Sequence, residues 1–116
     1  MKPPDDLEGE ALLEWVRICQ EMEKAGIDDP ANRAILILYV RTWSIWREAD
    51  RHVARHGSIQ KYNNGMHGPS PSFKVVKETA KILRGLLDQL GLSPIRRQKM
   101  KEAKSETPQD VGELQY

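Results

Sequence analysis

The segment from Pro71 to Arg97 constrains the fold more than any other part of this sequence. Its apolar residues recur at alternating steps of three and four, which places them on one stripe of an α-helix. That stripe contains Phe73, Val76, Ala80, Leu83, Leu87 and Leu90. A second stripe beside it contains Val75, Thr79, Ile82 and Leu86. The spacing therefore predicts a long helix with a wide apolar face.

Residues that start and stop helices bracket this segment. Ser70 can cap the first turn, and Pro71 suits the first helical position, because no backbone N–H is needed there. Gly91 follows the last apolar residue and predicts a left-handed terminator. Ser93 and Pro94 then repeat the start signal, which predicts a short C-terminal helix. The basic residues of that helix are Arg96, Arg97, Lys99 and Lys101.

Two further helices are predicted before this segment. The first runs from about residue 7 to residue 25. Its expected buried stripe is Leu12, Trp15, Val16, Cys19 and Met22. The second starts at the acidic cap Asp28-Asp29-Pro30 and meets no helix breaker before Gly57, so it would be roughly 40 Å long. Between Gly57 and Pro69, Asn63-Asn64-Gly65 predicts a β-hairpin, in which both turn residues would need positive φ.

The first half of the second helix indicates an oligomer. From Ala34 to Trp46 the sequence is apolar on almost all sides, and such a helix must be buried all round. Two neighbouring helices in a chain of 116 residues cannot easily cover it, so we expect another subunit to do so. The expected interface residues are Ile35, Tyr39, Trp43 and Trp46.

Length and composition predict one domain, with residues 1–6 as a mobile N-terminus, 7–103 as the helical domain and 104–116 as a flexible tail. The hairpin is expected at about 58–69.

No apolar run is long enough for a membrane span, and the acidic N-terminus does not resemble a secretory signal. Cys19 is the single cysteine and reads as a small buried hydrophobe. A cytosolic setting is therefore expected.

The net charge of +1 is unevenly distributed. Residues 1–10 and 102–116 each carry −3, so the centre carries +7, which is compatible with a nucleic-acid partner and also with an ordinary soluble protein. Cations on the long helix could form a solvated face, a docking face for acidic neighbours or a phosphate-contacting stripe. The candidate DNA-binding residues are Lys74, Lys77, Lys81, Arg84, Arg96, Arg97, Lys99 and Lys101.

Catalytic and metal-binding patterns are weak. No nucleophilic triad or Gly-rich phosphate loop is visible, so we expect neither an enzyme nor a cofactor. His52 and His56 stand at a spacing that can hold zinc, with His67 as a third candidate ligand. Arg51 and Arg55 flank the pair and would repel a cation, so we expect no metal site.

The segment Gly91-Leu92-Ser93-Pro94-Ile95-Arg96-Arg97 resembles the Gly-Leu-Thr/Ser-Pro-x-x-Arg motif that closes a family of phage terminase small subunits. Pro71 lies at the matching distance, and the resemblance extends over about residues 7–100. Ser70 stands where a His often precedes the helix-opening proline in that family. The resemblance implies an all-α, ring-forming subunit of the host cytoplasm. It would bind viral double-stranded DNA and regulate the large terminase subunit, which holds the ATPase and nuclease.

Two alternatives remain open at the level of sequence. The first is a DNA-binding regulator unrelated to packaging, which a dimer with a tight, palindromic target would favour. The second is a purely structural oligomerisation module, which an absence of DNA binding even at low salt would favour.

Overall fold

The computed structural model describes residues 1–93, 98 and 101–103. Its elements are, in order, α1 (Gly9–Lys24), the 3-10 helix η1 (Pro30–Asn32), α2 (Arg33–His56), β1 (Ile59–Lys61), β2 (His67–Pro69) and α3 (Pro71–Leu90). The chain is mostly helical, with one short antiparallel hairpin in its described part, as the sequence predicts. The predicted C-terminal helix lies mostly, and the tail entirely, outside the described residues.

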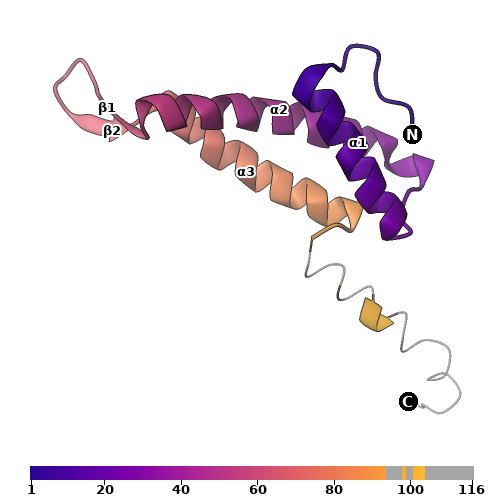
Figure 1. Ribbon diagram of the computed structural model, residues 1–116. Coiled ribbons are helices and arrows are strands. Elements are labelled where there is room, and N and C mark those ends of the chain that lie inside the picture. The colour runs from indigo at the N-terminus through magenta and orange to yellow at the C-terminus, as the bar shows by residue number, and fades with distance from the viewer. Residues whose placement is uncertain (94–97, 99–100, 104–116) are drawn as a thin grey trace, which may run out of the picture.

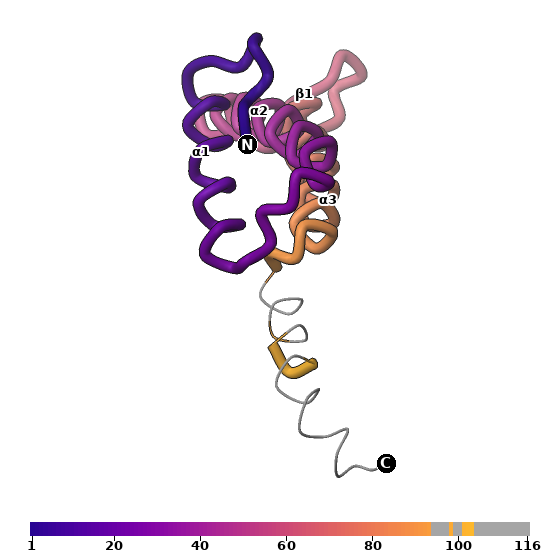
Figure 2. Tube along the Cα trace, turned by 90° about the vertical axis from the view of Figure 1, so that its right-hand side faces the viewer, coloured from indigo at the N-terminus to yellow at the C-terminus, as the bar shows by residue number. Residues whose placement is uncertain are grey.

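The two longest helices form an antiparallel pair. Figure 1 shows α3 running back beneath α2 and separating from it toward its own C-terminal end. Helix α1 crosses the pair at that end, whereas the β-hairpin extends from the opposite end (Figures 1 and 2). No helix among the described residues is long and apolar enough to cross a membrane.

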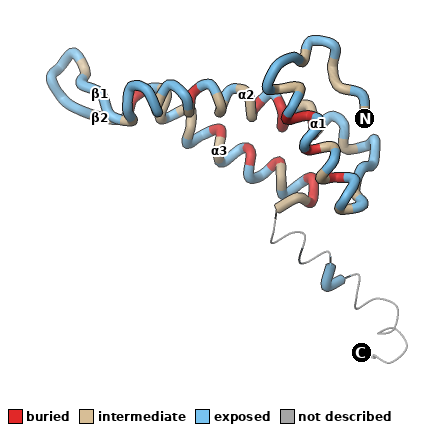
Figure 3. Tube along the Cα trace, viewed as in Figure 1, coloured by how far each residue is buried: buried red, intermediate tan, exposed pale blue. Residues whose placement is uncertain are grey.

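The hydrophobic core lies where α1 meets the other two helices. Figure 3 shows most of the buried residues gathered at this end. Each helix contributes three side chains to the cluster: Trp15, Ile18 and Met22 from α1; Leu36, Tyr39 and Val40 from α2; Leu83, Leu86 and Leu90 from α3. Nearer the hairpin, Ala49 is the one buried apolar residue in the described part of the chain. Buried apolar side chains are therefore concentrated at the α1 end, whereas the hairpin end, where α2 and α3 run closest together, buries few of them.

Two residues expected in the buried stripes are exposed. Val16 is 45% exposed, whereas Ile18, which was not expected in the core, is 2% exposed. The face of α1 that contacts the other helices runs along Trp15, Ile18 and Met22, and Val16 lies beside it. Ile82 is 49% exposed, because α3 contacts its neighbours along a narrower stripe than the sequence predicts.

The hairpin turn also differs from the prediction. Among the described residues only glycines have positive φ, so Gly65 (φ 84°) adopts it and Asn64 does not. The backbone N–H of Gly65 donates to the carbonyl of Tyr62 at 2.9 Å, and Tyr62 N–H donates to the carbonyl of Met66 at 2.8 Å. This is the three-residue connection in which a type I turn is followed by a glycine bulge, so one positive φ suffices.

Caps fix the helix ends where the sequence predicts them. The Ser70 hydroxyl accepts from the backbone N–H of Phe73 at 3.1 Å, and Gly91 ends α3 in the left-handed conformation (φ 79°). Asp29 accepts from the N–H of Ala31 at 2.9 Å. That cap opens a short 3-10 turn, and the α-helix begins only at Arg33.

Three of the first six residues are hydrogen-bonded to side chains of α1 and α2. The indole N–H of Trp15 donates to the carbonyl of Met1 at 3.2 Å. Arg33 donates twice to the carbonyl of Lys2, at 3.1 and 3.3 Å. Arg41 donates to both carboxylate oxygens of Asp6, at 2.8 and 3.1 Å.

Candidate nucleic-acid interface

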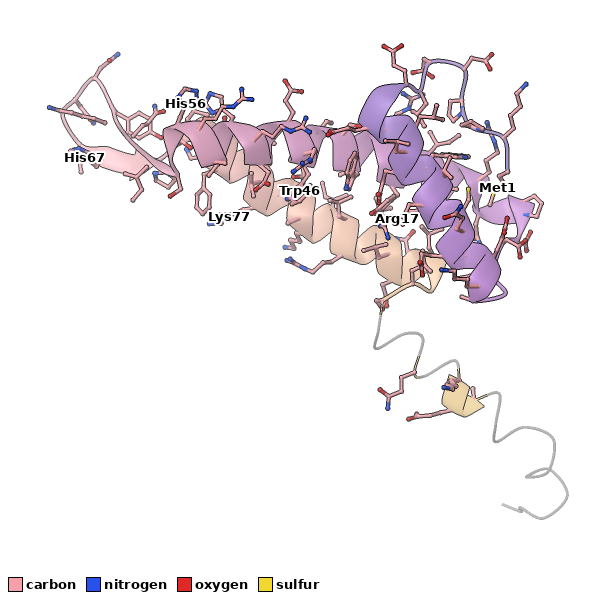
Figure 4. The ribbon with its side chains drawn as sticks, in the orientation of Figure 1. Met1, Arg17, Trp46, His56, His67 and Lys77 are labelled. Atoms are coloured by element: carbon pink, nitrogen blue, oxygen red, sulfur yellow. The ribbon has the colours of Figure 1, made fainter. Side chains whose placement is uncertain are left out.

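The predicted row of cations follows the exposed face of α3. Lys74, Lys77, Lys81 and Arg84 are all exposed, and none forms an ion pair with another described residue. Figure 4 shows Lys77 on the side of α3 that is turned away from α2. Its ammonium lies 5.7 Å from the ring centroid of Phe73, a cation–π distance that directs the side chain along the helix surface. The row is thus accessible along its length.

The second predicted cluster lies mostly outside the described residues. Lys101 is described and exposed, whereas Arg96, Arg97 and Lys99 are not described. Their relation to the row on α3 therefore stays a prediction.

A further basic row on α2 is partly neutralised. Arg47 lies 3.8 Å from a carboxylate oxygen of Glu10 and 4.0 Å from one of Asp50. Arg51 forms a hydrogen-bonded ion pair with the same Glu10. Arg55, one turn further, has no ion pair within the described part of the chain. The positive charge available on α2 therefore increases toward the hairpin.

The three histidines lie at the hairpin end. The rings of His52 and His56 are 4.4 Å apart, and Nδ1 of His52 is 2.9 Å from the hydroxyl oxygen of Ser72 on α3. Figure 4 places His56 at the end of α2 and His67 in the hairpin. Within the described residues, no group of three or more His, Cys, Asp or Glu side chains could hold a metal ion.

The residues expected at a subunit interface have different environments. Tyr39 is 4% exposed and belongs to the core of its own chain. Ile35, Trp43 and Trp46 are partly buried and pack against that core. Helix α2 also has apolar side chains that its own chain does not cover, since Leu38 and Ile45 are 53% and 54% exposed.

A hollow of about 360 Å³ lies between α1 and α2, beside the tryptophans. Trp43 and Trp46 line it together with Leu13, which is 70% exposed. Glu10, Glu14, Arg17 and Arg47 complete the lining. The hollow has an apolar surface and a charged rim, so it could receive an apolar side chain from another subunit.

Beside this hollow lies a buried polar contact that the sequence pattern did not predict. Glu14 is 6% exposed and accepts a hydrogen bond of 2.7 Å from the Tyr39 hydroxyl. Arg17 donates two hydrogen bonds of 2.8 Å to the same carboxylate. Burial, followed by the bond to Glu14, raises the pKa of Tyr39, and the bond to Glu14 raises the pKa of Arg17. The contact between Glu14 and Arg17 can be predicted from the sequence, because residues three positions apart on a helix are neighbours.

Comparison with known proteins assigns the chain to a family. Residues 11–107 match the family model described as phage terminase, small subunit. No curated protein and no solved structure matches the chain. The matched residues include nearly all of α1 and the whole of α2, the hairpin and α3. Because the match spans most of the sequence, this protein belongs to the family of phage terminase small subunits.

Proposed function

We propose that this terminase small subunit binds viral double-stranded DNA and regulates the large subunit during genome packaging. It would do so without catalytic residues of its own. The observation that carries the DNA-binding role is the accessible row Lys74, Lys77, Lys81 and Arg84, which has no ion-pair partner among the described residues. Unpaired cations at steps of three and four can contact successive phosphates, and they release counterions when they do so.

Assembly into a ring is the second part of the proposal. A single chain leaves Leu13, Leu38 and Ile45 more than half exposed, and it leaves the tryptophan-lined hollow open. Contiguous exposed apolar surface, such as Leu13 beside Trp43 and Trp46 at the hollow, is typical of protein–protein contacts. We propose that Ile35, Trp43 and Trp46 support the contact and that Tyr39 acts from within the core by fixing α1 against α2.

Repetition around the assembly would supply the affinity. Each copy offers few phosphate contacts, which gives weak binding by one chain. Linked weak sites act at high effective concentration, so a ring of such copies binds far more tightly than one subunit. The proposed division of labour is a helical domain at 7–103 for assembly and DNA, with the tail 104–116 directed to the large subunit.

Two measurements on the wild-type protein test this proposal. Static light scattering gives the mass of the native assembly, which should exceed that of a dimer. Fluorescence anisotropy with labelled duplex DNA at several salt concentrations gives the affinity, which should fall steeply as salt rises. A folded monomer at low concentration contradicts the ring, and an absence of binding at low salt contradicts the DNA role.

A further inference from the structure

The charge of the chain is concentrated at the hairpin end. Residues 51–77 contain no Asp or Glu, whereas they contain five Lys or Arg residues and all three histidines of the protein. This segment comprises the end of α2, the hairpin and the start of α3, which lie together at one end of the molecule (Figure 1). Protein surfaces ordinarily intersperse the two signs of charge. We call residues 51–77 the basic tip.

The opposite end of the molecule has the opposite sign. Residues 1–30, which precede α2, contain nine acidic residues and three Lys or Arg residues. One of these acids, Glu10, reaches the basic row of α2 and pairs with Arg47 and Arg51. The last of these ion pairs is at Arg51, the first residue of the tip. Arg55 and Lys61, further along the tip, form no ion pair with any described residue.

The hairpin presents one basic and apolar face to solvent. In its register Lys61 lies opposite His67, and Ile59 lies opposite Pro69. All four residues are exposed, and Ile59 reaches 64%. Figure 1 shows the strands extending beyond the ends of α2 and α3. This ribbon therefore has the exposure of a surface that contacts a partner.

The ribbon is also held in one conformation. The N–H of Ser70 donates to the carbonyl of Ser58 at 2.8 Å and closes its base. The Tyr62 hydroxyl donates to the carbonyl of Pro69, so the ring lies over Gly68. A Cβ at Gly68 would come within 3.0 Å of Cε2 of Tyr62. A ribbon fixed in this way loses little conformational freedom when it binds.

We infer that the basic tip is a DNA-contacting surface that places the β-ribbon in a groove of the duplex. The major groove of B-DNA is about 12 Å wide and admits a two-stranded ribbon. Arg55 and Lys61 would contact phosphates on the two sides of that groove, and Lys74 and Lys77 would extend the contact along α3. This inference rests on the proposed DNA role and adds the surface that makes the contact.

Two double variants with equal charge loss test the inference. Arg55→Gln with Lys61→Gln removes two cations of the tip. Lys2→Gln with Lys24→Gln removes two exposed cations from the acidic end of the molecule, away from the tip and from the row on α3. Fluorescence anisotropy with a labelled duplex of about 30 base pairs measures the association constant K at several salt concentrations. These values give the slope of log K against the logarithm of the salt concentration. The tip variant is expected to bind DNA more weakly, and the magnitude of its slope should fall by up to about 1.8 for each copy that contacts the DNA. The control should keep the wild-type slope.

Each other outcome has a definite meaning. A lower slope for the control alone, or equal losses for both variants, overturns the tip assignment and leaves the proposed DNA role intact. An absence of wild-type binding at low salt contradicts the proposed function itself. Light scattering is run on both variants, and a tip variant that changes the assembly mass makes the tip a contact between copies, which also overturns the inference.

A positional measurement gives an independent answer. In a Cys19→Ala background, a chelated iron is attached at Asn63→Cys in the hairpin turn or at Gln89→Cys near the far end of α3. Hydroxyl radicals from the iron cleave nearby DNA backbone. Cleavage from position 63 and little from position 89 supports the inference, and the reverse pattern overturns it.

Discussion

The hydroxyl of Tyr39 on α2 donates a 2.7 Å hydrogen bond to the buried carboxylate of Glu14 on α1. The two residues are 25 positions apart in the sequence, and their bond fixes how α1 crosses α2. Arg17 neutralises the carboxylate from the solvent side through two further bonds. Burial of a charged group is tolerated here because it is both paired and hydrogen-bonded.

The first prediction concerns this contact. Tyr39→Phe removes the hydroxyl and leaves the buried carboxylate one donor short, which should lower the free energy of unfolding by about 1.5–3 kcal/mol. Urea unfolding followed by circular dichroism measures the change. The control is Tyr62→Phe, whose hydroxyl bonds the exposed hairpin and whose loss should cost less than about 0.5 kcal/mol. Equal losses for the two variants would contradict the role given to Tyr39.

The second prediction concerns the titration of Asp6. Its hydrogen bonds to Arg41 lower the pKa of the carboxyl below the ordinary value of 3.8. A depressed folded-state pKa means that the ion pair contributes to stability above pH 3.8 and that this contribution is lost as the pH falls through the folded pKa. NMR titration of the Asp6 carboxyl should show the low midpoint, and Arg41→Gln should return it toward 3.8. A midpoint unaffected by Arg41→Gln would show that the pair does not form in solution.

The third prediction concerns assembly. Trp46→Glu places a charge at the hollow between α1 and α2 and should dissociate the oligomer into smaller species. Light scattering measures the mass, and circular dichroism checks the fold. Met66→Glu, at a 67% exposed position in the hairpin, adds the same charge away from the hollow and should keep the wild-type mass. A wild-type protein that sediments as a folded monomer would refute the prediction.

The fourth prediction concerns the C-terminal segment. Deletion of residues 105–116 should leave thermal unfolding unchanged and weaken stimulation of the large subunit's ATPase. The segment is polar, with Val111, Leu114 and Tyr116 near its end, a composition suited to docking on a partner. ATP hydrolysis by the large subunit, with full-length or truncated protein added, provides the measurement. Unaltered stimulation would count against a regulatory role for the tail.

The fifth prediction concerns the row on α3. Replacing Lys74, Lys77 and Lys81 together by Ala should reduce the slope of log K against log salt without dissociating the oligomer. The reduction should be about 0.9 for each phosphate that the variant no longer neutralises. The triple variant of Arg97, Lys99 and Lys101 is measured in the same way. If both triple variants keep the wild-type slope, neither cluster binds DNA, and Arg47, Arg51 and Arg55 are the next residues to replace.

Local features of the fold could be predicted from the sequence because their causes are local. Ser70 caps α3 through the N–H of a residue three positions away, and Gly91 ends it by a conformation that glycine adopts readily. The position of the hairpin is predictable for the same reason, since Asn-Gly marks a tight turn. Its geometry is not, because the bond between Tyr62 and Met66 decides which residues need positive φ.

Features that depend on distant neighbours could not be predicted. Periodicity shows that α1 has an apolar stripe, but the angle at which α1 crosses α2 and α3 decides that Ile18 is buried and Val16 is not. Glu14 reads as a surface residue until Tyr39 is placed beside it. The same distinction between local and distant causes applies to the candidate DNA-binding residues. The row on α3 follows from helical spacing, whereas the basic tip becomes a single surface only when α2, the hairpin and α3 are brought together.

The uneven distribution of the core has a consequence for local stability. Nine large side chains pack together at the α1 end, whereas Ala49 is the one buried apolar residue among the described residues nearer the hairpin. Regions with little buried apolar surface open at a lower free energy than the whole molecule. Backbone amides at residues 47–56 and 71–78 should therefore exchange hydrogen with solvent through openings that leave the α1 end folded. Each copy thus has a rigid base and a compliant arm. In the proposed ring, copies joined through their bases would follow a curved surface with their arms.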